Sequence, residues 1–149
     1  MKKALALFFI LFNTYFLALA QSADKISEII ESTNVNYGQI SYLAAIHAGL
    51  ADETANQQQC LNILEEKGFV QKGHSDTEQI PLEQVAFICA KTWNVKGGIF
   101  YSIFKNPRYS LKQLKADGVI PENSDPSKKL SGFEALNIIS ACIEQYGEN

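Results

Sequence analysis

Two histidines are the residues of this 149-residue chain best suited to acid–base chemistry, because imidazole titrates near neutral pH. His47 follows an apolar stretch that predicts a helix, where a structural role is favoured over catalysis. His74 lies in QKGHSDTEQ, which predicts a solvated loop. Neither has a carboxylate or cysteine at a spacing that indicates a catalytic pair. The sequence therefore predicts no catalytic residue and no enzymatic activity.

Acidic side chains gather in the segment ENSDPS, which contains Glu122 and Asp125. Carboxylates in a loop are calcium ligands, but this segment lacks the regular acidic spacing of an EF-hand loop. A turn with solvated acids is the favoured interpretation. Neither a metal site nor a cofactor is predicted.

Three cysteines, Cys60, Cys89 and Cys142, all lie in apolar helical contexts. The favoured interpretation is three buried thiols that act as small apolar side chains. The alternative is a Cys60–Cys89 disulfide between neighbouring helices, which an oxidising compartment permits. No cysteine spacing indicates a zinc site or a redox pair.

Aromatic side chains cluster around the stretch IFYSIF, which follows Gly97 and predicts a short apolar helix ending near Pro107. Basic side chains lie among them, Lys105 and Arg108. One interpretation is that the aromatics seal a contact between helices. The other is an exposed groove for a glycan or a partner protein. The candidate groove residues are Trp93, Phe100, Tyr101, Phe104, Arg108 and Tyr109.

The chain begins with Lys2 and Lys3, followed by an apolar run that ends at Ala20. This pattern predicts a signal peptide over residues 1–20, and an uncleaved anchor is the alternative. Removing the two lysines changes the formal charge from −3 to −5. An acidic chain of this kind argues against nucleic acid or an anionic membrane surface as the main partner. Residues 21–149 have the length of one domain, without a further apolar stretch that could span a membrane.

The part of the chain after residue 20 contains a repeat. LNILEEKGFV, which begins at Leu61, aligns with LKQLKADGVI, which begins at Leu111, so that Gly68 meets Gly118. Glycine at these positions predicts the left-handed conformation that ends a helix. A partial copy, VNYGQISYLAA from Val35, aligns with IPLEQVAFICA further along the chain. We therefore expect a half unit followed by two whole units of about 50 residues.

The second helix of each unit has its own start signal. Ser131 and Glu134 form a capping box in the last unit, and Asn36 with Gln39 can do the same in the half unit. Pro81 replaces the capping side chain in the middle unit, which the start of a helix tolerates. These signals, without alternating β-branched runs, predict an all-α fold of tandem helix–loop–helix repeats.

This unit resembles the S-layer homology module, a helix–loop–helix repeat. The resemblance lies in LKQLKADGVI followed by DPSKKLSGFEAL, and it covers roughly residues 54–146 as two units. In the family, a proline is followed four residues later by an Ile-Thr-Arg-Ala-Glu box. Here Pro126 is followed by Leu130, Ser131 and Glu134 at the matching positions. The resemblance implies one helical repeat domain over residues 21–149.

Departures from the family pattern bear on function. Family modules anchor proteins to cell-wall polysaccharide, and the arginine of the box contributes to an anionic sugar site. Gly132 stands at that position here, and Leu82 stands there in the middle unit. Without the arginine, such a site lacks a bidentate donor. The resemblance therefore implies the fold more directly than the glycan-binding activity.

These observations predict a non-enzymatic protein of the cell envelope, secreted across the inner membrane into the periplasm. The expected partner is another envelope protein, for which the chain acts as a binding or scaffolding component. A cell-wall glycan or peptidoglycan is the alternative partner, and an envelope hydrolase is a remote third hypothesis. Neither a nucleic-acid partner nor a membrane span after signal cleavage is expected.

Overall fold

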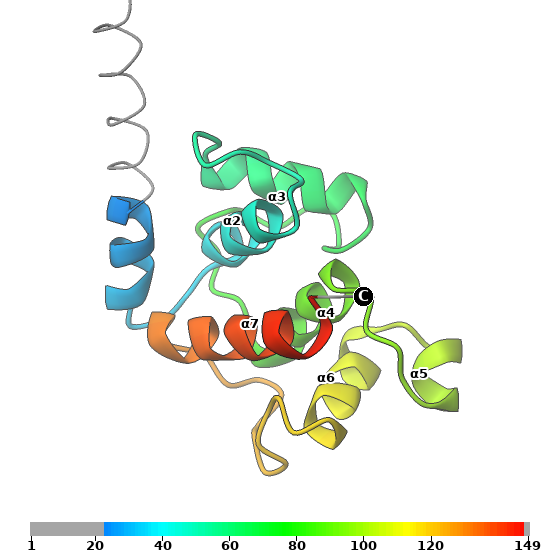
Figure 1. Cartoon of the computed structure of the whole chain (residues 1–149). Coiled ribbons are helices and arrows are strands. Elements are labelled where there is room, and N and C mark those ends of the chain that lie inside the picture. The colour runs from blue at the N-terminus through cyan, green and yellow to red at the C-terminus, as the bar shows by residue number, and fades with distance from the viewer. Residues whose placement is uncertain (1–22, 148–149) are drawn as a thin grey trace, which may run out of the picture.

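A computed structural model describes residues 23–147, and the predicted signal peptide lies outside this range. The fold is all-α, as predicted, and no strand occurs within the described residues (Figure 1). Residues 23–31 are helical and are followed by six named helices. These are α2 (Tyr37–His47), α3 (Gln57–Glu66), α4 (Leu82–Thr92), α5 (Ile99–Ile103), α6 (Pro107–Ala116) and α7 (Gly132–Tyr146).

Side-chain caps define where the helices begin. The Ser131–Glu134 capping box at α7 and the Asn36–Gln39 box at α2 are both formed, as predicted. Pro81 is the N-cap of α4 and makes no side-chain cap, also in agreement with its expected place. The capping box at α3, between Asn56 and Gln59, was not predicted, although Asn-x-x-Gln is the same signal.

Glycines end α3 and α6 in the same way. Gly68 has φ of 70° and Gly118 has φ of 80°, the left-handed conformation that the sequence predicted. The next N–H group in each case, that of Phe69 or Val119, donates to a carbonyl of the last helical turn at 2.8 or 2.9 Å. This geometry turns the following residue of each segment, Val70 or Ile120, into the core.

The starts of α2, α4 and α7 are joined in a closed ring of backbone hydrogen bonds. The first N–H group of each helix donates to a carbonyl in the loop that precedes another of the three. The pairs are Tyr37 to Glu78 (2.9 Å), Leu82 to Lys128 (2.9 Å) and Gly132 to Ser32 (2.8 Å). These donors have no intrahelical acceptor, so the ring satisfies them while it fixes the three helices to one another.

Packing between helices does not follow the boundaries of the sequence units. α3 packs chiefly against α2, and α6 packs chiefly against α4, so the first helix of a unit lies on the second helix of the unit before it. One continuous hydrophobic core runs through these contacts and includes the fully buried Leu64, Ile88 and Leu114. α3 and α6 therefore pack most closely on a helix of the preceding predicted unit.

Gly132 lies where the segment after the first helix crosses the start of α7. A Cβ atom at this position would lie 1.6 Å from the carbonyl oxygen of Ile29. Ile29 is itself fully buried. The S-layer homology box has an arginine at this position. In this fold, only glycine leaves room for the backbone of Ile29.

Candidate interaction surface

The six aromatic and basic residues predicted to form a groove divide into two groups. Trp93 is 9 % exposed and Tyr101 is 5 % exposed, so both belong to the core. Phe100 and Phe104 are 68 % and 49 % exposed, and Arg108 is also exposed. Tyr109 is partly buried against the core, so the cluster is divided between residues that seal helix contacts and residues that face outward.

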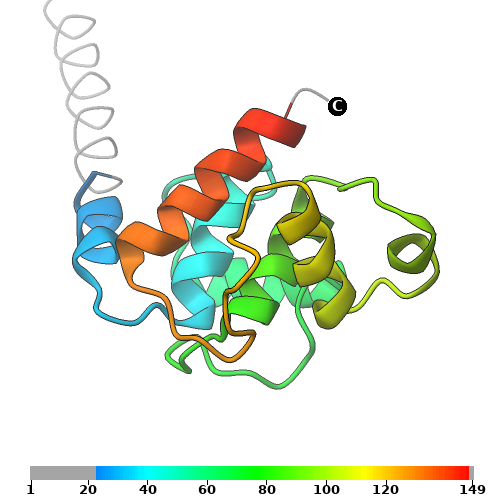
Figure 2. The same cartoon turned by 90° about the horizontal axis from the view of Figure 1, so that it is seen from below.

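The outward group forms an apolar surface on α5. Four large apolar side chains of this short helix and its end are exposed, Ile99, Phe100, Ile103 and Phe104, and we call them the α5 surface. Ile99 is the most exposed, at 77 %. Figures 1 and 2 show α5 at the outer edge of the molecule, where two loops connect it to α4 and α6. Exposed apolar side chains grouped in this way mark an interaction site more often than singly scattered ones do.

Contacts with α6 hold α5 in this position. The Tyr109 ring stacks on Phe104 at a centroid distance of 5.5 Å and on Phe100 at 6.4 Å, and the Lys112 ammonium lies 5.5 Å from the centre of the Tyr109 ring. The Gly98 N–H donates to the Gln113 side chain at 3.0 Å. Between α5 and α6 lies a hollow of about 220 Å³. α5 is thus supported on one side and open on the other.

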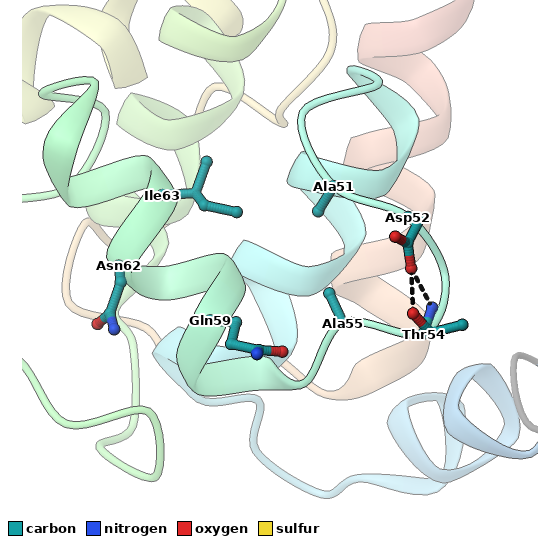
Figure 3. A pocket seen from close by; sticks show the side chains of 7 residues that line it. All are labelled: Ala51, Asp52, Thr54, Ala55, Gln59, Asn62 and Ile63. Atoms are coloured by element: carbon teal, nitrogen blue, oxygen red, sulfur yellow. Dashed lines mark hydrogen bonds between the residues drawn. The ribbon is translucent and has the colours of Figure 1, made fainter.

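A second hollow, of about 550 Å³, lies between α3 and the loop after α2 (Figure 3). Its polar groups already have partners. Asp52 accepts hydrogen bonds from the hydroxyl and the N–H of Thr54, and these bonds lower the pKa of the Asp52 carboxyl. The Lys25 ammonium donates to the carbonyl of Ala55 at 3.0 Å and so ties this loop to the first helix. The arrangement stabilises a loop, and the Asp52 carboxylate and the Thr54 hydroxyl that line the hollow are bonded to each other.

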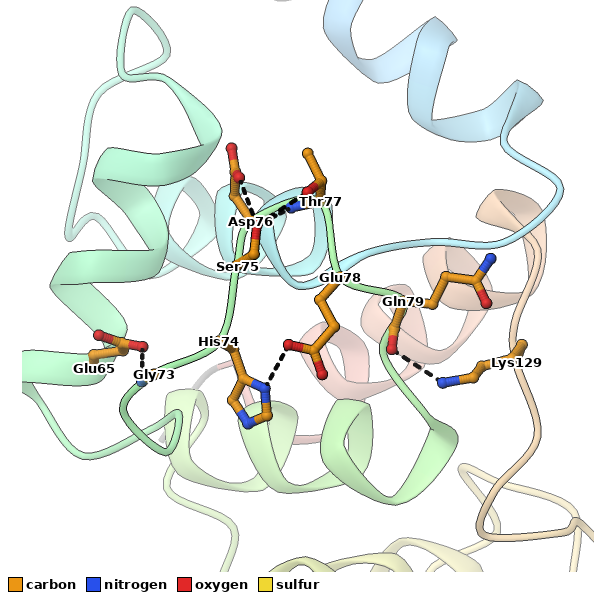
Figure 4. A network of polar contacts seen from close by, with 9 residues as sticks. All are labelled: Glu65, Gly73, His74, Ser75, Asp76, Thr77, Glu78, Gln79 and Lys129. Atoms are coloured by element: carbon orange, nitrogen blue, oxygen red, sulfur yellow. Dashed lines mark hydrogen bonds and ion pairs between the residues drawn. The ribbon is translucent and has the colours of Figure 1, made fainter.

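His74 belongs to a polar network in the loop before α4 (Figure 4). Its Nδ1 lies 2.9 Å from the Glu78 carboxylate, and its ring stacks on Tyr37 with centroids 4.1 Å apart. Glu78 was not predicted as the partner of His74, although the spacing of four residues was the available signal. The hydrogen bond with His74 lowers the pKa of Glu78. His74 is half-buried rather than fully solvated, and His47 is exposed in the last turn of α2.

The Tyr37 phenol gives this region a measurable pH dependence. Burial, helped by the charges of Glu78 and Glu83, raises its pKa to about 12. An unfolded tyrosine ionises near pH 10, so the stability associated with neutral Tyr37 is complete below about pH 10 and is lost between about pH 10 and 12. We expect Tyr37→Phe to move the alkaline unfolding midpoint, followed by circular dichroism, to higher pH. An unchanged midpoint would contradict this assignment.

The three cysteines are buried free thiols, as the favoured interpretation predicted. The alternative Cys60–Cys89 bridge is not formed: α3 packs on α2, and the thiol beside Cys89 is that of Cys142 on α7. The Cys142 thiol and complete burial raise the pKa of Cys89 well above its ordinary value. The Cys89 thiol is therefore not an activated nucleophile.

The predicted acidic turn is held by Asp125 within it and by Lys115 of α6. Asp125 accepts hydrogen bonds from the N–H and the hydroxyl of Ser127 at 2.8 and 2.7 Å. The Lys115 ammonium donates to the carbonyls of Glu122 and Ser124 at 2.7 and 2.9 Å. Over the described residues, no group of three or more His, Cys, Asp and Glu side chains is placed to hold a metal ion.

No protein-family model, no curated protein and no solved structure matches this chain. Among the helices of residues 23–147, none combines the length and the apolar character needed to cross a membrane.

Proposed function

We propose that this protein is a non-enzymatic interaction component of the cell envelope and that the α5 surface is its contact site. The observation that carries the proposal is the exposure of four large apolar side chains on one short helix. Leaving this much apolar area in water is unfavourable by roughly 25 cal/mol per Å², and covering it would supply binding free energy. The polar hollow and the His74 network, by contrast, are internally satisfied.

The same proposal includes the repeat organisation and the secretion predicted from the sequence. The matching glycine ends of α3 and α6 and the ring that joins α2, α4 and α7 support the repeat. The apolar run before Gln21 supports secretion.

Protection of a cysteine placed on the α5 surface tests this function. The native thiols are at most 1 % exposed and react slowly in the folded protein, so Ile99→Cys introduces one accessible thiol. We expect a maleimide to label Ile99→Cys at least about tenfold more slowly in isolated cell envelopes than in the purified protein, because a bound partner covers the α5 surface.

The matched control is Phe133→Cys, at a residue that is 64 % exposed and lies on α7. Its labelling rate should be similar in both settings. Equal labelling of Ile99→Cys in envelopes and in purified protein would show that nothing covers the α5 surface there, and would overturn the proposed function. An envelope protein and a cell-wall glycan, the partners expected from the sequence, would both produce protection.

A further inference from the structure

Charge is unevenly distributed along this acidic chain. The whole sequence has a formal net charge of −3, yet residues 84–116 contain six lysines and arginines and no aspartate or glutamate. This range includes α5, most of α4 and all of α6. The negative net charge therefore comes from the rest of the chain, and the region around the α5 surface is basic.

Four of these cations are exposed beside the α5 surface, Lys96, Lys105, Arg108 and Lys112. Lys96 and Lys105 flank α5 in the sequence, whereas Arg108 and Lys112 lie on α6, which packs against it. Two ion pairs form within the described part of the chain, His74–Glu78 and Lys128–Glu134, and neither uses these cations. Within the described residues, the positive charge beside these apolar side chains therefore has no ion-pair partner.

The composition of this region distinguishes between kinds of partner. The cores of protein–protein interfaces are depleted in lysine, and interfaces typically carry one hydrogen bond per 100–200 Å². Between residues 99 and 105, however, Ser102 is the only neutral polar side chain apart from the buried Tyr101. Phenylalanine and isoleucine next to lysine and arginine are typical of segments that lie at a membrane–water interface. There, the apolar side chains enter the acyl region while the cations remain with the headgroups.

We propose that the α5 surface docks on an anionic lipid bilayer surface. The proposal rests on the proposed function, since it takes α5 as the contact site, and it names anionic lipid as the partner. The α5 side chains insert at the level of the headgroups, and the surrounding cations pair with lipid phosphates. α5 lies at the outer edge of the molecule, so the helix can approach a flat surface before the body does (Figure 2). The acidic remainder is repelled by such a surface, which orients the molecule with α5 toward it.

Co-sedimentation with lipid vesicles tests this proposal. The protein and its variants are purified from the envelope fraction of the cells. All of them are then processed at the N-terminus in the same way, so differences in vesicle binding come from the substitutions. Vesicles of phosphatidylcholine alone are compared with vesicles that contain phosphatidylglycerol. We expect partitioning onto the anionic vesicles to be at least about tenfold stronger, and to weaken as salt screens the charges. Phe100→Asp combined with Phe104→Asp, and separately Lys105→Glu combined with Arg108→Glu, should each reduce the partitioning at least about tenfold.

Matched controls separate the α5 surface from general effects. Phe133→Asp changes an aromatic that is 64 % exposed but lies outside the α5 surface, and Lys72→Glu changes an exposed lysine outside the basic region. Both should bind like the unmodified protein. Circular dichroism and the fluorescence of the single tryptophan, Trp93, check that each variant is folded.

Equal partitioning onto neutral and anionic vesicles, or unchanged binding of both α5 double variants, would overturn the lipid proposal. So would crosslinking of Ile99→Cys to a discrete envelope protein without vesicle binding, which would assign the α5 surface to a protein partner. In that case Ile99→Cys remains protected in envelopes and the proposed function stands. Loss of both protection and vesicle binding would reject the two together.

Discussion

Gly132→Ala is expected to destabilise the protein by roughly 3 kcal/mol, because a side chain at this position collides with backbone. The new Cβ atom would lie 1.6 Å from the Ile29 carbonyl oxygen and 2.6 Å from its carbonyl carbon. Overpacking of this kind costs about 1–3 kcal/mol when the surroundings can move. Here the movement would also break the 2.8 Å bond from the Gly132 N–H to Ser32, worth about 1 kcal/mol. It would draw the buried Ile29 out of the core.

Urea unfolding followed by circular dichroism measures this effect, and the melting temperature should fall by on the order of 10 °C. Gly98→Ala is the matched control, because nothing lies within 4 Å of a Cβ atom built at Gly98 and its φ of −62° suits alanine. We expect that control to change stability by less than about 0.5 kcal/mol. If the two variants unfold alike, residues 29–32 do not pack on α7 as described.

Tyr101→Ala is expected to cost about 3 kcal/mol, whereas Phe100→Ala is expected to cost less than about 0.5 kcal/mol. The two residues are neighbours in the sequence, but Tyr101 is 5 % exposed and Phe100 is 68 % exposed. Removing the Tyr101 ring leaves a cavity in the core, while removing the Phe100 ring takes an apolar side chain out of water. The same substitution is therefore expected to lower stability at Tyr101 and to change mainly the exposed surface at Phe100.

Chemical denaturation of both variants distinguishes these roles, with unchanged slopes of the transition as evidence that the folded and unfolded states are comparable. A Phe100→Ala variant as unstable as Tyr101→Ala would mean that Phe100 is part of the core. The α5 surface would then lose its most prominent aromatic, and the lipid proposal would lose its main apolar contact.

Features that depend on a few consecutive residues were predictable from the sequence. The capping boxes of α2 and α7 and the glycine ends of α3 and α6 are examples, because each arises from hydrogen bonds or backbone conformations within about one helical turn. The short helix α5 was predictable in the same way, from the glycines that precede it and the Asn106–Pro107 start of α6 that follows it.

The division of the aromatic cluster was not predictable on this basis. Phe100 and Tyr101 are both aromatic residues in one short helix, and which of them is buried depends on where α6 lies. The cysteines show the same limit: all three fit a buried helix face, but only the packing of α4 against α7 brings Cys89 next to Cys142.

The sequence by itself determined that this chain forms helices, where most of them begin and end, and that one region is rich in aromatics. The tertiary structure decided which helices pack together and which aromatics face water. It also explains why position 132 requires a glycine. The physical reason is the range of the interactions. Caps and glycine turns act over three to five residues, whereas burial depends on residues far apart in the chain, such as Ile29 and Gly132.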